Sequence, residues 1–181
     1  YEEALQTVEF LKNINTGKAN IIGTSGGALV GINCALLSPE RINRVIADSF
    51  EGEYALDIIA ETIDNERENS KSDNNMVRFW KENHGKDWEA VVDMDTKAII
   101  KHYKNVKNFF PGKLSELKVP VLLTGSLEDE YAEYISFEEN YKKMLEKLPD
   151  GKMYLFKKGG HPAFITAGNE FFQTAKEFFT K

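Results

Sequence analysis

Cysteine is nearly absent from this 181-residue sequence, in which Cys34 is the only one. A single thiol cannot form an intramolecular disulfide, and a metal site built from several cysteines is excluded as well. Cys34 falls within an apolar helical segment, where we expect a buried structural thiol rather than a reactive one. A chain without disulfides fits a reducing compartment, so the expected location is cytoplasmic.

The sequence also lacks a basic excess and long apolar runs. Its 23 Lys and Arg residues are outnumbered by 29 Asp and Glu residues, which gives a net charge of −6. Nucleic-acid partners are therefore not expected, because phosphate binding needs a basic surface. No segment approaches the roughly 18 to 20 apolar residues of a membrane-spanning helix. No signal peptide is visible, and we expect no membrane partner.

The residues that are present have the mixture of a globular domain, 41% hydrophobic and 29% charged. Four apolar runs predict strands at Ala19–Thr24, Arg44–Asp48, Val119–Thr124 and Lys152–Phe156. Helices are predicted around Ala4 to Leu11, over Gly26–Leu37, and after a capping box formed by Ser136 and Glu139. A last helix starts near Asn169 and is expected to bury Phe171, Phe172, Ala175, Phe178 and Phe179. Strands that alternate with helices predict an α/β fold with helices on the faces of a parallel sheet.

Residues 51–113 interrupt this alternation and predict a helical insertion into a core made of residues 1–50 and 114–181. The insertion contains helical patterns at Tyr54–Ile63, Met76–Trp80 and Trp88–Tyr103, and a polar run at Asp64–Asn75. Its aromatic residues Phe79, Trp80 and Trp88 have two interpretations, the lining of an apolar substrate pocket or ordinary packing.

One pentapeptide, Gly23-Thr24-Ser25-Gly26-Gly27, matches the pattern G-x-S-x-G between a predicted strand and a predicted helix. This strand, turn and helix is the setting of a nucleophile elbow, so Ser25 is the candidate nucleophile. Gly23 and Gly27 stand two residues from the serine on either side, where we expect that a Cβ would crowd the turn. The following helix directs free N–H groups toward the place where an oxyanion would form.

A reactive serine needs a base, and the chain has three histidines. His161 lies in the segment K-G-G-H-P just after the fourth predicted strand, which places it at the carboxyl edge of the sheet, where ligands bind in open α/β folds. His84 and His102 fall on polar stretches of the insertion and are expected at the surface. His161 is therefore the candidate base.

The base needs an acid to orient it, and the third predicted strand ends in T-G-S-L-E-D-E. Asp129 is the preferred acid, and Glu128 and Glu130 compete with it. Asp48, at the end of the second predicted strand, is a further alternative whose plainer role is to cap the local turn.

The order Ser25, Asp129, His161 is that of one hydrolase fold. The segments G-T-S-G-G, P-V-L-L-T-G-S-L-E-D-E and G-G-H-P resemble the three signature sites of the alpha/beta-hydrolase family, and S-P-E-R-I-N-R-V-I-A-D is similar to its next helix end and strand. The resemblance implies Ser25 as nucleophile, His161 as general base and acid, Asp129 as its partner, and the Gly26 N–H as an oxyanion donor. It also implies a small-molecule acyl substrate, no metal or organic cofactor, and residues 51–113 as the cap.

The family usually places several strands before the nucleophile, whereas only 24 residues precede Ser25 here. The resemblance therefore implies a partial core that lacks the loop carrying the second oxyanion donor, and a start at Tyr1 indicates a fragment or a processed chain. The strand Ala19–Thr24 would then be an exposed apolar edge, able to pair with a second copy or a partner chain. Two functions stay open: a serine hydrolase for a small ester, thioester or amide, or an incomplete fragment or ligand-binding module without turnover.

Overall fold

The computed structural model describes residues 1–14 and 17–180 and divides into two compact units. The sheet unit is formed by Tyr1–Glu53 together with Phe109–Lys181, and the helical insertion is formed by Tyr54–Asn108. Within the described residues, no helix is both long and apolar enough to cross a membrane.

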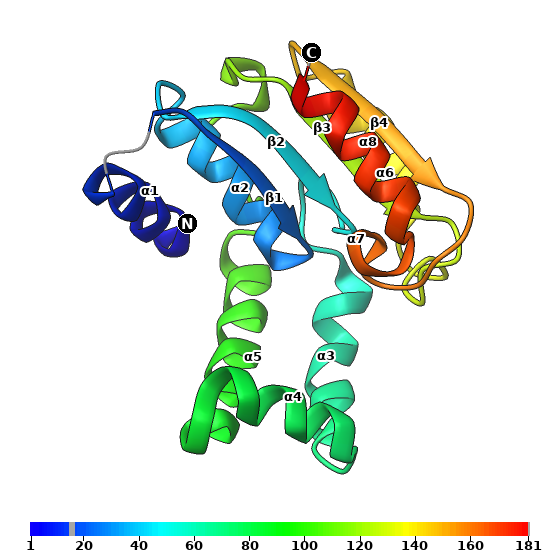
Figure 1. The fold of residues 1–181 in the computed structure, drawn as a ribbon. Coiled ribbons are helices and arrows are strands. Elements are labelled where there is room, and N and C mark those ends of the chain that lie inside the picture. The colour runs from blue at the N-terminus through cyan, green and yellow to red at the C-terminus, as the bar shows by residue number, and fades with distance from the viewer. Residues whose placement is uncertain (15–16, 181) are drawn as a thin grey trace. The chain divides into compact units, whose positions relative to one another are not determined.

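The sheet unit is built around four parallel strands in the order β1-β2-β3-β4 (Figure 1). The strands are β1 (Ala19–Thr24), β2 (Ile42–Asp48), β3 (Val121–Ser126) and β4 (Gly151–Phe156). All four lie close to their predicted positions, and the predicted α/β class is confirmed. β3 begins at Val121 and not at Val119 as predicted, since Pro120 between them has no N–H to donate to a ladder.

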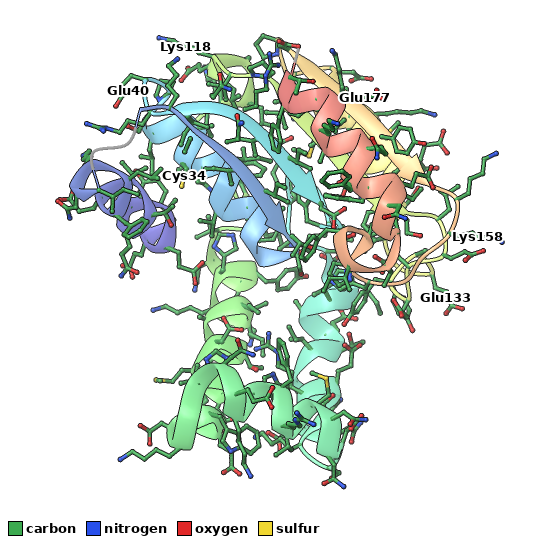
Figure 2. All side chains as sticks on the ribbon, in the orientation of Figure 1. Cys34, Glu40, Lys118, Glu133, Lys158 and Glu177 are labelled. Atoms are coloured by element: carbon green, nitrogen blue, oxygen red, sulfur yellow. The ribbon has the colours of Figure 1, made fainter. Side chains whose placement is uncertain are left out.

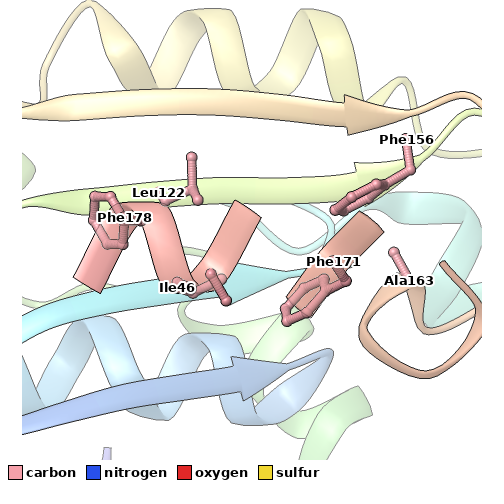
Figure 3. Packing of buried hydrophobic residues seen from close by; sticks show 7 residues of the cluster. Ile46, Leu122, Phe156, Ala163, Phe171 and Phe178 are labelled. Atoms are coloured by element: carbon pink, nitrogen blue, oxygen red, sulfur yellow. The ribbon is translucent and has the colours of Figure 1, made fainter. Parts of the chain in front are cut away.

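The two faces of the sheet are covered by different helices. On one face, α2 (Gly26–Leu37) approaches so closely that a Cβ on Gly31 would lie 3.0 Å from Ile21 Cγ2 and 3.3 Å from Val45 Cγ1. On the other face, Ile46 and Leu122 are register partners on neighbouring strands. They form one buried cluster with Phe171 and Phe178 of α8 (Gly168–Thr180), as Figure 3 shows.

The aromatic residues of α8 divide between core and surface. Phe171, Ala175 and Phe178 are buried as predicted, whereas Phe172 is 60% exposed, so its predicted burial is wrong. Consecutive residues of a helix point in different directions, and Phe171 takes the inward one. Phe179 is partly buried against the same cluster.

The first helix, α1 (Glu2–Asn13), packs against α2. Cys34 of α2 (Figure 2) is fully buried, and its thiol donates to the carbonyl of Ala4 at 3.6 Å. Burial raises the pKa of the Cys34 thiol above its usual value, which keeps it in the unreactive protonated form. The expectation of a structural thiol agrees with these surroundings.

The short turn η2 (Leu114–Glu116) precedes β3, and the helix α6 (Phe137–Leu145) lies between β3 and β4 in the chain. The predicted cap is present, since Ser136 Oγ accepts a hydrogen bond from the Glu139 N–H. Tyr141 of α6 is fully buried, and its hydroxyl lies 3.1 Å from the carbonyl oxygens of both Phe50 and Thr124. This contact fixes α6 to the ends of β2 and β3.

The helical insertion consists of α3 (Asp57–Ser70), α4 (Asn74–His84), the single turn η1 (Gly85–Asp87) and α5 (Trp88–Asn105). Trp80 and Trp88 stack with ring centroids 5.5 Å apart in its core, while Phe79 is 56% exposed. α3 continues into the predicted polar run because its polar residues pair with α5, as in the ion pair between Arg67 and Asp95.

Candidate active site

Ser25 stands between the last residue of β1 and the first residue of α2, in a backbone conformation that only glycine adopts easily. Its φ is 52° and its ψ is −123°, and such a conformation in a non-glycine residue costs about 1–3 kcal/mol. Ser25 is exposed and occupies the N-cap position of α2, yet its hydroxyl makes no capping hydrogen bond. The hydroxyl is therefore held at the surface of the turn and is not used by the helix.

The two outer glycines of the pentapeptide have different roles. A Cβ on Gly23 would lie 2.1 Å from the carbonyl oxygen of Gly27, so the turn cannot close around any larger residue. A Cβ on Gly27 would meet nothing within 4 Å. The predicted crowding is thus confirmed at Gly23 and wrong at Gly27.

His161 and Asp129 are in direct contact. His161 Nδ1 lies 2.9 Å from Asp129 Oδ2, and the Asp129 side chain is 0% exposed against 22% for His161. The second carboxylate oxygen of Asp129 accepts the Tyr131 N–H at 2.9 Å. The Tyr131 ring also stands edge-on to the imidazole, with centroids 5.0 Å apart. Both oxygens of the carboxylate are engaged, which fixes the orientation of the imidazole.

The neighbouring acids have other surroundings. Glu128 is exposed, and its backbone N–H donates to Ser126 Oγ. Glu130 accepts the backbone N–H of His161 with its carboxylate. A Cβ on Gly160 would lie 2.5 Å from Glu130 Oε1, so the glycine makes room for this contact. The contact between Glu130 and the histidine backbone was not predicted, and the second glycine of K-G-G-H-P is the only sequence signal for it.

Asp48, the remaining alternative acid, is fully buried at the end of β2. Its carboxylate accepts Thr124 Oγ1–H at 2.7 Å, Thr24 Oγ1–H at 3.3 Å and the Phe164 N–H at 2.9 Å. Burial raises the pKa of Asp48 above its usual value, although these hydrogen bonds act to lower it. The carboxylate thus reaches well beyond the local turn that it was expected to cap, into the segment after His161.

Ser25, Asp129 and His161 follow the carboxyl ends of β1, β3 and β4, the edge of a parallel sheet where ligands bind. Among the described residues, no hydrogen bond joins Ser25 Oγ to the His161 ring. Such bonds are often long or poorly aligned in enzymes without substrate. The Gly26 N–H belongs to the first residue of α2 and has no acceptor within that helix.

The other two histidines belong to the helical insertion, where His84 ends α4 in an exposed position and His102 is half-buried on α5. In the part of the chain that the structure describes, no three His, Cys, Asp or Glu side chains are grouped to hold a metal ion.

No protein-family model and no curated protein matches this sequence. Solved structures do match its fold. A serine hydrolase involved in carbazole degradation (the CarC enzyme) is 20% identical with a TM-score of 0.71, over 98% of this chain and 69% of that chain. The protein NosK from Streptomyces actuosus is 14% identical with a TM-score of 0.76, over 98% of this chain and 74% of that chain. An esterase from Exiguobacterium antarcticum is 16% identical with a TM-score of 0.67, over 98% of this chain and 72% of that chain. The chain therefore has the alpha/beta-hydrolase fold over the part of those structures that it spans.

Proposed function

We propose that this chain is a serine hydrolase that cleaves a small ester, thioester or amide through an acyl-enzyme at Ser25. The observation that carries the proposal is the 2.9 Å contact between His161 Nδ1 and the buried carboxylate of Asp129. It lies at the same sheet edge as the strained elbow that presents the Ser25 hydroxyl. A serine hydroxyl becomes a useful nucleophile only beside an oriented base, and these residues are of the types that supply one.

In the first half of the reaction, Ser25 Oγ attacks the carbonyl carbon of the substrate while its proton passes to His161 Nε2. The bond to the leaving group then breaks, the leaving group takes the proton from His161, and the acyl group stays on Ser25. In the second half, water gives a proton to His161 and attacks the acyl carbon. The acid is released as Ser25 regains its proton.

Asp129 keeps the imidazole in the tautomer that presents Nε2 as the acceptor, because its carboxylate holds the Nδ1–H. The Gly26 N–H donates to the oxyanion of the tetrahedral intermediate.

The substrate class is proposed from the reaction type and from the activities for which the similar structures are named. Besides the serine hydrolase and the esterase, these include an enol-lactonase from Burkholderia xenovorans LB400, which is 15% identical with a TM-score of 0.66. All three names describe the cleavage of acyl compounds or the use of a serine for hydrolysis, and no metal or organic cofactor is proposed. The proposed location is the cytoplasm, where the single buried thiol stays reduced.

The test is covalent labelling of the intact protein with a fluorophosphonate, followed by mass spectrometry. The wild type is expected to gain one adduct, mapped to Ser25. The variants Ser25→Ala and His161→Ala should gain none while keeping the wild-type circular dichroism spectrum. A wild type that remains unlabelled would overturn the proposal for this chain.

A second candidate is a binding module that uses the same residues without turnover, favoured by the lack, among the described residues, of a hydrogen bond between Ser25 Oγ and the His161 ring. Hydrolysis of a chromogenic acetate ester distinguishes the two functions. Steady release of the chromophore supports an enzyme. One burst of release per protein, with no further turnover, supports the binding module.

A further inference from the structure

Three polar side chains form a row across the sheet just before the candidate site. Thr24 of β1, Asp48 of β2 and Thr124 of β3 are successive register partners in the parallel ladder. Both threonine hydroxyls donate to the Asp48 carboxylate, which is 0% exposed. A carboxylate in such a place is costly unless it is fully hydrogen-bonded, so its contacts identify what the position is used for.

Another contact of Asp48 is with the segment that follows His161. The short helix α7 (Ala163–Thr166) has Pro162 as its N-cap, which offers no side-chain acceptor to the first N–H groups of the helix. Two residues at the end of β2 act as the acceptors instead. Ser49 Oγ accepts the Ala163 N–H at 2.9 Å, and Asp48 Oδ2 accepts the Phe164 N–H at 2.9 Å. The end of β2 therefore anchors the histidine segment.

The same carboxylate oxygen also contacts the nucleophile segment. Asp48 Oδ2 accepts from Thr24, the residue directly before Ser25, and from Phe164, three residues after His161. The Ser25 N–H itself donates to the backbone carbonyl of Asp48 at 2.8 Å. A shift of the histidine segment relative to the elbow would have to break these contacts.

We propose that Asp48 is a positioning residue that ties the nucleophile strand to the histidine segment and sets the distance between Ser25 and His161. This inference rests on the proposed function. Among the described contacts, the Asp48 side chain reaches neither the His161 imidazole nor the Ser25 hydroxyl. Its effect on the two groups therefore passes through the backbone. Reacting groups misplaced by about 1 Å can lose about 100-fold in rate, which is why such a tie matters.

The competing role for Asp48 is that of the acid that orients the imidazole. Replacing the carboxylate with an amide of the same shape distinguishes the two roles, because the amide keeps the hydrogen bonds of a positioning residue and loses the charge of an orienting acid. In Asp48→Asn the amide oxygen can still accept the Phe164 N–H, and the amide NH2 can donate to Thr124 Oγ1, so the tie survives without the charge. In Asp129→Asn the carboxylate that faces the imidazole is lost, and the tautomer is no longer fixed.

The experiment measures the second-order rate of fluorophosphonate labelling per folded protein, well below the melting temperature. We expect D48N to react at close to the wild-type rate and D48A to react ~10- to 100-fold more slowly. The matched control is Thr124→Val, which removes a buried hydrogen bond to Asp48 Oδ1 and leaves the bond to Phe164. T124V should lower the melting temperature as D48A does, but label at close to the wild-type rate.

Amide hydrogen exchange tests the tie independently of reactivity. The Phe164 N–H should be protected in the wild type and in D48N, and exchange fast in D48A. If D48N is labelled as slowly as D129N, the proposal is overturned and Asp48 is the orienting acid. This comparison does not depend on whether D48A folds. A folded D48A with wild-type labelling and a protected Phe164 would overturn it too. Failure of the proposed function has another signature, a wild type that is not labelled at all.

Discussion

Glu128, Asp129 and Glu130 are consecutive acids with three different surroundings. Glu128 is exposed, Asp129 is buried against the His161 ring, and Glu130 is exposed with its carboxylate on the His161 backbone. The sequence could predict that an acid stands at the end of this strand. It could not decide between them, because burial and contact depend on how the loop meets the histidine segment.

Replacing Asp129 with Asn should lower the labelling and hydrolysis rates by about 100- to 10,000-fold, since the amide no longer favours the correct imidazole tautomer. Glu128→Gln, the matched control one residue away, should react like the wild type because its side chain is exposed. Equal rates for the two variants would show that Asp129 does not orient the base. The measurement is the rate of fluorophosphonate labelling at fixed pH.

The raised pKa of Asp48 makes the stability of the folded protein depend on pH. Its native pKa lies above the ordinary value of 3.8, with burial as the largest cause. The native state therefore holds this proton to higher pH than the unfolded state does. The contribution of Asp48 to stability is complete below 3.8 and is lost as the pH rises through the raised native value.

The amide of Asp48→Asn does not titrate. The stability of D48N relative to the wild type should therefore increase from acidic pH toward neutral pH. Urea denaturation of both proteins at a series of pH values measures this difference, in which the other titrating groups largely cancel. Thr124→Val keeps Asp48 and should retain the wild-type pH trend. A difference that is constant, or that falls toward neutral pH, would contradict the raised pKa.

At the scale of elements, the sequence predicted those with a strong local pattern. α2 has its predicted bounds, because the elbow begins it and Ser38-Pro39 ends it. α7 was not predicted, since its four residues are too few to show a period and its first N–H groups are accepted by Ser49 and Asp48. Elements stabilised by distant residues leave little trace in their own sequence.

The elbow gives a prediction that compares two glycines of one pentapeptide. Gly23→Ala places a Cβ 2.1 Å from a backbone oxygen, which should lower the free energy of unfolding by about 3 kcal/mol. Gly27→Ala meets no neighbour within 4 Å and replaces a helical glycine, so it should stabilise the fold by about 0.4–1 kcal/mol. Urea denaturation measures both. Equal effects would mean that the turn is not closed as described.

At the scale of the whole molecule, the sequence predicted the parallel sheet, the helical insertion and an exposed apolar edge. Among the strands that the structure describes, β1 has a neighbour on one side only, and Ile22 of β1 is 47% exposed. β4, at the opposite edge, carries the exposed charge of Lys152, whereas no residue of β1 is charged. Charges on edge strands discourage pairing with other chains, so β1 is the edge that lacks this protection.

We expect the protein to associate at rising concentration through β1, with a second copy adding to the sheet. Ile22→Lys places a charge on the edge and should shift the protein toward the monomer in sedimentation velocity experiments. Phe172→Lys is the matched control, because it removes an apolar side chain that is 60% exposed on a helix, and it should leave the association unchanged. A wild type that stays monomeric at every concentration would contradict the prediction. An equal loss of association in both variants would point to general surface hydrophobicity and not to strand pairing, because only Ile22 belongs to the unpaired edge.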